Sequence, residues 1–114
     1  MSSDYQVDRQ GGPIGATVSD IDLNNLDSNA VDFLRNALST HLVLFFRDQS
    51  LDPASLLTLA SKFGVPAPYP FVKGVPGFPK VVEVVKRPED TRNFGGVWHS
   101  DTAYLKTPAM GALL

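Results

Sequence analysis

The stretch from Val65 to Pro79 constrains the fold of this chain more than any other part of its sequence. It contains five prolines and two glycines within fifteen residues. Proline has no backbone N–H and clashes with a preceding helical turn, so neither a helix nor a central strand tolerates this density. We therefore predict an extended loop. Long loops in compact domains are commonly functional or disordered, and the aromatic side chains of Tyr69 and Phe71 favour an ordered lid or rim.

Two helices are expected in the part of the chain before this loop. The first, over residues 28–40, follows a turn cluster in which Asp27 or Ser28 can act as the N-cap, and its apolar residues recur at helical spacing. The second, over residues 53–63, has Asp52 as its N-cap and a proline at the first helical position. A glycine follows this helix directly, as is common at helix ends.

Strands are expected in runs that are rich in apolar or β-branched residues. They cover residues 14–23, 41–46, 80–85, 97–105 and 109–114. The run 41–46 is almost continuously apolar and should be buried on both faces. Both helices come early, and the later part holds only strands and loops. We therefore predict an α+β or mainly β fold in which the helices pack beside a sheet or sandwich.

The size and composition of the chain limit its class. Its 114 residues, 43% of them hydrophobic, suit a flexible N-terminus over residues 1–10 and one small domain over residues 11–114. Ten basic and twelve acidic residues give a net charge of −2, and the basic residues are scattered, so no nucleic-acid partner is expected. The sequence has no cysteine, no signal peptide and no long apolar run, which predicts a cytoplasmic protein without disulfides or a membrane partner.

His99 and Asp101 are the candidate metal ligands. Both residue types bind divalent metals, and in a strand residues i and i+2 point to the same face. A motif this short often arises by chance, so the spacing alone favours an ordinary Asp–His hydrogen bond or a solvated pair. The neighbouring Trp98 and Tyr104 are, on the same grounds, more often core or rim aromatics than substrate contacts.

The residues around this pair closely resemble a known family. The stretch NFGGVWHSDTAYLKTPAMGALL is similar to the metal-binding stretch of the taurine dioxygenase-like family of Fe(II)- and 2-oxoglutarate-dependent oxygenases. There, W-H-[ST]-D precedes an aromatic residue and a proline-containing turn. Three upstream blocks also follow the family's order, namely GATVSDIDL, LVLFFRDQSLDP, and ASKFG with the proline-rich loop behind it. The resemblance runs from about residue 11 to the C-terminus and favours a metal site.

The resemblance implies a partial double-stranded β-helix, or jelly-roll, with two flanking helices. It also implies an iron held by a facial triad of two His and one carboxylate, which leaves positions for 2-oxoglutarate and O₂. Carried over to this chain, His99 is the first nitrogen ligand and Asp101 is the carboxylate ligand. The implied activity is hydroxylation of a small organic substrate, coupled to decarboxylation of 2-oxoglutarate to succinate and CO₂.

Two parts of the family's site have no counterpart in this sequence. In the family, a second His ligand and an Arg that binds 2-oxoglutarate lie late in the chain. Here no His follows Asp101, and the last Arg is Arg92. The other histidine, His41, stands at a helix-to-strand junction and is interpreted as structural. We therefore expect the chain to be the N-terminal part of a longer enzyme, apparently truncated and inactive alone.

The substrate is less constrained than the metal site. Members that act on taurine use a His in the loop before the metal strand and an Asn close to the metal motif. Here that loop has Tyr69 and no His, and Asn93 stands at a larger offset. Tyr69, Lys73 and Asn93 are the substrate-side candidates, for a sulfonate or another organic acid. The alternatives are a short non-catalytic binding or assembly protein, such as a homodimer that buries an open sheet edge, and a Zn²⁺ site on the same pair.

Overall fold

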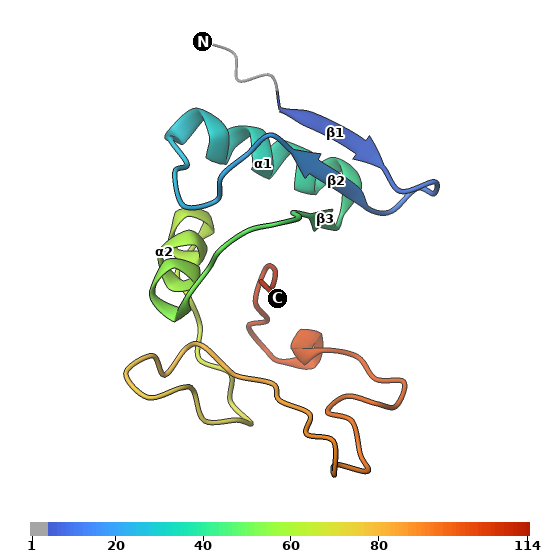
Figure 1. Ribbon diagram of the computed structural model, residues 1–114, viewed down its shortest axis with the longest axis vertical. Helices are drawn as coiled ribbons and strands as arrows, with labels where there is room; N and C mark the ends of the chain where they lie inside the picture. The colour runs from blue at the N-terminus through green and yellow to red at the C-terminus, as the bar shows by residue number, and fades with distance from the viewer. Residues whose placement is uncertain (1–4) are drawn as a thin grey trace. The chain divides into compact units, whose positions relative to one another are not determined.

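The computed structural model describes residues 5–114, which fall into two compact units, the first ending at Val65 and the second spanning Pro66–Leu114. The first unit holds the sheet, the two long helices and the core, in the order β1, β2, α1, β3, α2 (Figure 1). The second unit is built of loops and turns with one short 3₁₀ helix. None of the described helices is long and apolar enough to cross a membrane.

A three-stranded sheet in the order β1-β2-β3 forms one layer of the first unit. β1 (Gln6–Arg9) is antiparallel to β2 (Ala16–Ser19), and β2 is parallel to β3 (Leu44–Phe45). In the central strand the side chains of Ala16 and Val18 are buried, and the two that alternate with them are half-buried. This period of two is the pattern of a strand with one face on the core.

The start of β2 is fixed by hydrogen bonds to the end of α1. Gly15 has a φ of +97°, a conformation that favours glycine, and its N–H donates to the carbonyl oxygen of His41 at 2.8 Å. The N–H of Ala16 donates to the carbonyl oxygen of Val43 at 3.0 Å. The backbone of His41 thus joins helix to sheet, and the structural role expected for its side chain stays a prediction.

Helix α1 (Ser28–His41) follows the sequence expectation closely. The carboxylate of Asp27 accepts a hydrogen bond from the N–H of Ala30 at 2.8 Å, which satisfies one of the free donors of the first turn. Ala30, Leu34 and Ala37 lie on one face at helical spacing, and all three are buried. The helix ends at His41, and its C-cap residue Leu42 takes left-handed angles and donates its N–H to the carbonyl oxygen of Leu38.

Helix α2 (Pro53–Phe63) begins with a capping box between Asp52 and Ser55, and proline occupies its first turn as predicted. Its far end is tied to α1 by one guanidinium. Arg35 donates to the carbonyl oxygens of Lys62 at 3.2 Å and Phe63 at 2.8 Å, so two of the last carbonyls of α2 have donors.

The core lies between the sheet and the two helices. Its buried members come from β2, the β2–α1 connection, α1 and α2, and they are Val18, Leu23, Leu26, Ala30, Leu34 and Leu59. The most deeply buried large side chains are Leu34 and Val18, with exposed fractions of 1% and 2%. Hydrophobic burial of these few side chains is the main source of stability, as expected for a small unit.

Two expectations for the first unit are wrong. Residues 6–9 form β1 instead of belonging to a flexible segment 1–10, of which residues 1–4 lie outside the described part. This polar segment gains strand structure from pairing with β2, which the sequence pattern does not reveal. The run 41–46 contributes only a two-residue strand, because His41 and Leu42 are used by the helix and its cap. Val43 and Phe45, each 42% exposed, are not buried on both faces.

The second unit contains the proline-rich loop and the candidate metal ligands. As predicted, residues 65–79 form no helix, and Val75 and Phe78 make an isolated bridge. The rings of Tyr69 and Phe71 meet edge to face, with centroids 5.6 Å apart. The expected strands over residues 80–85, 97–105 and 109–114 do not form in this unit. A strand needs a partner for its backbone N–H and C=O groups, and no strand of the described chain is paired with these runs.

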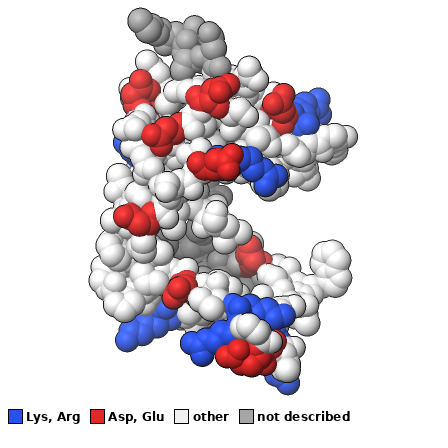
Figure 2. Space-filling model, in the orientation of Figure 1, with Lys and Arg blue, Asp and Glu red and all other residues white. Residues whose placement is uncertain are grey.

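The observed fold is therefore a small α+β arrangement of three strands and two helices, plus an irregular second unit. The α+β class agrees with the sequence expectation. A jelly-roll is not seen in residues 5–114. On the face drawn in Figure 2, acidic and basic side chains of the described residues occur side by side, and they do not form a continuous patch of one sign.

Candidate metal centre

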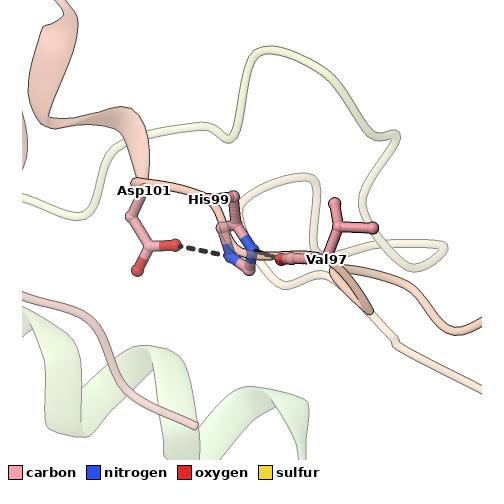
Figure 3. A network of polar contacts seen from close by, with 3 residues as sticks. All are labelled: Val97, His99 and Asp101. Carbon is pink, nitrogen blue, oxygen red and sulfur yellow. Dashed lines mark hydrogen bonds and ion pairs between the residues drawn. The ribbon is translucent and has the colours of Figure 1, made fainter.

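His99 and Asp101 face each other in the second unit. Nε2 of His99 lies 3.3 Å from Oδ1 of Asp101 (Figure 3). Asp101 has extended backbone angles and directly precedes the 3₁₀ helix η1 (Thr102–Tyr104). In extended backbone, residues i and i+2 lie on the same side. The two side chains therefore converge as the spacing predicts, although the segment is a loop that turns into η1 and not a strand.

The other nitrogen of the His99 ring is fixed by the main chain. Nδ1 lies 2.7 Å from the carbonyl oxygen of Val97. A carbonyl oxygen can only accept, so Nδ1 must carry a proton and donate. In the neutral ring the lone pair is then on Nε2 and is directed at Asp101. Imidazoles that bind metals typically donate their second N–H to a backbone carbonyl or carboxylate in this way.

Nε2 of the neutral ring and Oδ1 of Asp101 present the same kind of hydrogen-bonding group to each other. With Nδ1 protonated, a neutral ring presents an acceptor to a carboxylate oxygen, which is also an acceptor, and two acceptors at 3.3 Å repel. A cation bound by both atoms would remove the repulsion, because both lone pairs would then face the cation. The donor set of one imidazole nitrogen and one carboxylate oxygen suits a borderline divalent metal, so these residues fit two positions of such a site.

The pair is accessible from solvent. The His99 side chain is 50% exposed and that of Asp101 is 89% exposed. An open depression beside them is lined by residues 95–99, among which Trp98 is fully exposed. Within residues 5–114 no third His, Cys, Asp or Glu completes a cluster with the pair. The described part thus supplies two candidate ligands.

The substrate-side candidates are placed differently from one another. Asn93 begins the turn over residues 93–96, and the Cβ that Gly95 lacks would lie 3.1 Å from Cε1 of His99. The side-chain oxygen of Asn93 accepts a hydrogen bond from Nζ of Lys86. Tyr69 and Lys73 lie exposed in the proline-rich loop. Within the described residues, no hydrogen bond or ion pair joins either of these two to His99 or Asp101.

Sequence reasoning missed the elements that hold the His99 ring. These are the carbonyl of Val97 and the Gly95–Gly96 turn, together with the Lys86 contact to that turn. The glycine pair two residues before the Trp was visible in the sequence and is the one signal that pointed to a tight turn. The carbonyl contact depends on backbone geometry that no residue type reveals.

Comparison with known proteins identifies the class to which this fold and site belong. A family model described as Taurine catabolism dioxygenase TauD, TfdA family matches residues 6–114. The chain belongs to this family.

Individual relatives agree with the family. An alkylsulfatase of Acinetobacter baylyi is 34% identical over 102 residues, which are 88% of this chain and 31% of the relative. A solved structure of a taurine dioxygenase from Burkholderia xenovorans is 32% identical, with a TM-score of 0.62 over 68% of this chain and 28% of that one. A putative alpha-ketoglutarate-dependent taurine dioxygenase from the same organism is 28% identical, with a TM-score of 0.64 over 74% of this chain and 32% of that one. The chain thus spans about a third of the length of these relatives.

Proposed function

We propose that this chain supplies the first metal-binding arm of an Fe(II)- and 2-oxoglutarate-dependent dioxygenase, in which His99 and Asp101 are two of the protein ligands. The observation that carries the proposal is the convergence of Nε2 of His99 and Oδ1 of Asp101 at 3.3 Å, with Nδ1 held by the Val97 carbonyl. Membership of the family and the alpha-ketoglutarate dependence named for one relative support it.

Each residue has a defined part in this proposal. His99 binds as a neutral imidazole through Nε2, and Asp101 binds as an ionised carboxylate. The Val97 carbonyl keeps the proton on Nδ1, so the lone pair of Nε2 stays directed at the metal position. When bound, iron would supply the oxidation of substrate by O₂ that accompanies decarboxylation of 2-oxoglutarate to succinate and CO₂.

The substrate class we propose is a small organic acid that carries a sulfonate or sulfate group. Two relatives are named for such compounds, since one is an alkylsulfatase and another a taurine dioxygenase. Asn93 is the favoured substrate-side residue because its turn lies close to His99. Tyr69 and Lys73 are further candidates in the exposed loop, and the ammonium of Lys73 would suit an anionic group. Such a metabolic enzyme would act in the cytoplasm.

We further propose that the 114-residue chain is inactive by itself. Residues 5–114 provide two candidate ligands and no third. The last Arg in the sequence is Arg92, which precedes the metal pair, so the expected partner of the 2-oxoglutarate carboxylate has no counterpart after Asp101. Planar bidentate recognition of a carboxylate is a property of Arg that Lys does not reproduce.

The alternative is a non-catalytic binding or assembly protein, and one observation favours it. Near the edge strand β3, Leu42 is 60% exposed, and Val43 and Phe45 are each 42% exposed. An apolar sheet edge of this kind can pair with a second copy. Light scattering on the purified chain distinguishes the readings, because a stable homodimer favours assembly and a monomer does not.

Metal titration tests the proposed ligand pair. Mn(II) serves as an air-stable substitute for Fe(II), and its dissociation constant is measured for the chain by EPR. We expect His99→Ala and Asp101→Ala each to lose most of the binding, because each removes one of two ligands. His41→Ala is the matched control and should bind as the unmodified chain does. Unchanged binding by His99→Ala would contradict the proposal.

A further inference from the structure

The turn over residues 93–96 lies close to the imidazole of His99, and we propose that this turn positions the ligand and that Lys86 holds the turn in place. The proposal rests on the proposed function of His99 as a metal ligand and adds Gly95 and Lys86 as positioning residues. Neither residue belongs to the donor set of the metal pair.

Gly95 leaves the space beside the His99 ring free of a side chain. It has a φ of +65°, and a Cβ built on it would lie 3.1 Å from Cε1 and 3.6 Å from Nε2 of His99. Any larger residue would therefore be strained in its backbone and would press on the ring edge that carries the ligand nitrogen. With glycine at position 95 this space stays free, and the ring keeps Nδ1 at the Val97 carbonyl and Nε2 toward Asp101.

The turn that presents Gly95 is tight. Gly96 donates its N–H to the carbonyl oxygen of Asn93 at 3.2 Å, and a Cβ on Gly96 would lie 2.9 Å from Cβ of Asn93. The two glycines thus serve different purposes, since Gly96 closes the turn and Gly95 receives the ring.

Lys86 ties this turn to the preceding loop. Its Nζ donates to Oδ1 of Asn93. A second turn, over residues 87–90, brings the chain back toward Lys86. In this turn Asp90 donates its N–H to the carbonyl oxygen of Arg87 at 3.0 Å, and its carboxylate accepts a hydrogen bond from the N–H of Arg87 at 2.8 Å. The hydrogen bond between Lys86 and Asn93 therefore joins the two ends of the loop over residues 86–93. A charge-assisted hydrogen bond is suited to holding such an exposed loop.

Ring spectra and metal affinity together test the device. Long-range ¹H–¹⁵N NMR of the metal-free chain at a fixed pH reports which ring nitrogen of His99 carries the proton. We expect the Nδ1–H form in the unmodified chain and a mixture of both forms in Gly95→Ala. The Mn(II) dissociation constant should rise about tenfold in Gly95→Ala, which is typical when the support of a ligating His is lost. Lys86→Met should raise it several-fold, and Lys86→Arg should restore it.

Matched variants and a folding readout keep the test specific. Gly111→Ala places a Cβ with no atom within 4 Å, and Lys80→Met removes an exposed lysine of the same unit, so both should match the unmodified chain. The helical signal of α1 and α2 in far-UV circular dichroism reports the folding of the first unit, and the dispersion of backbone amide ¹H–¹⁵N signals reports that of the second unit in each variant.

Two results separate this inference from the proposed function. If Gly95→Ala keeps both the Nδ1–H form and the affinity for Mn(II), the positioning role is wrong although the ligand pair stands. In the second result, the unmodified chain holds the Nδ1–H form, Gly95→Ala loses it, and neither protein binds Mn(II). This result would support the positioning of the ring by Gly95 and refute the role of His99 as a metal ligand.

Discussion

The side chain of Gln49 clamps the loop that carries Leu23. Its Oε1 accepts the N–H of Leu23 at 3.0 Å, and its Nε2 donates to the carbonyl oxygens of Ile21 and Arg47, each at 3.0 Å. One amide thereby satisfies three backbone groups in the connections before α1 and α2. Leu23 itself belongs to the core, so the clamp couples a polar network to hydrophobic packing.

Replacing Gln49 by leucine tests this clamp. Gln49→Leu keeps the approximate volume and leaves a part-buried N–H and two carbonyls without their side-chain partner. Loss of such hydrogen bonds should lower the free energy of unfolding by about 1–3 kcal/mol. Urea denaturation followed by circular dichroism measures it. Gln6→Leu on the exposed side of β1 is the matched control, and equal stability of the two variants would contradict the role of the clamp.

Leu34 is expected to be the most sensitive core position. Its side chain is 1% exposed and lies in the cluster between the sheet and both helices. Truncation removes buried methyl groups and leaves a cavity, which should cost about 2–5 kcal/mol. That is a large fraction of the stability of a small domain. In the same denaturation experiment, Leu114→Ala at a fully exposed leucine should have almost no effect. If Leu34→Ala lowers the free energy of unfolding by less than about 0.5 kcal/mol, the packing of Leu34 does not stabilise the unit and the prediction is wrong.

The stability of the first unit should fall in acid. The backbone N–H of Ser55, and then its hydroxyl, lower the pKa of Asp52 below its ordinary value of 3.8. The backbone N–H of Asn24, and then the side chain of Asn25, likewise lower the pKa of Asp22. Because each folded pKa lies below the unfolded one, the stabilisation is present above about pH 4 and is lost as the pH falls through the folded values.

Unfolding midpoints measured between about pH 2 and pH 6 check this dependence. In Asp52→Asn the amide can still cap α2 but cannot titrate, so the decline in acid should be shallower than in the unmodified chain. Asp22→Asn should be shallower for the same reason. A variant curve that is parallel to that of the unmodified chain would show that these carboxylates do not contribute.

The 114-residue chain should release no succinate above background when it is mixed with Fe(II), ascorbate, 2-oxoglutarate and candidate sulfonates. The reason is that its described residues offer two candidate ligands and no third. Liquid chromatography with mass spectrometry detects succinate directly. Turnover that disappears in His99→Ala would contradict the proposed inactivity while supporting the metal site.

The helices could be predicted from the sequence because their signals are local. Asp27 caps α1 and Asp52 caps α2, as the residue types indicated, and both helices end within one residue of the expected position. The strands were predicted poorly because pairing is a relation between distant segments. The polar β1 pairs with β2, whereas the apolar run 80–85 is not paired with any strand of the described chain.

The candidate site likewise has one part that the sequence predicted and one part that it did not. The spacing of His99 and Asp101 predicted that their side chains converge, and extended backbone is sufficient for that. The family resemblance was also confirmed. The support for the ring was not foreseen, because the contacts of Val97, Gly95 and Lys86 arise from turn geometry. The metal role of the pair stays a prediction.

Direct observation of ligation at His99 tests the central proposal most sharply. The sequence has two histidines, so His41 is a built-in control for ring ¹⁵N spectra of the intact chain. On titration with Zn(II), a diamagnetic probe, we predict that the Nε2 signal of His99 moves, its Nδ1–H signal persists and the His41 ring is unchanged. Asp101→Asn should weaken this response. An unmoved His99 ring, or equal movement of both rings, would contradict the proposed metal site.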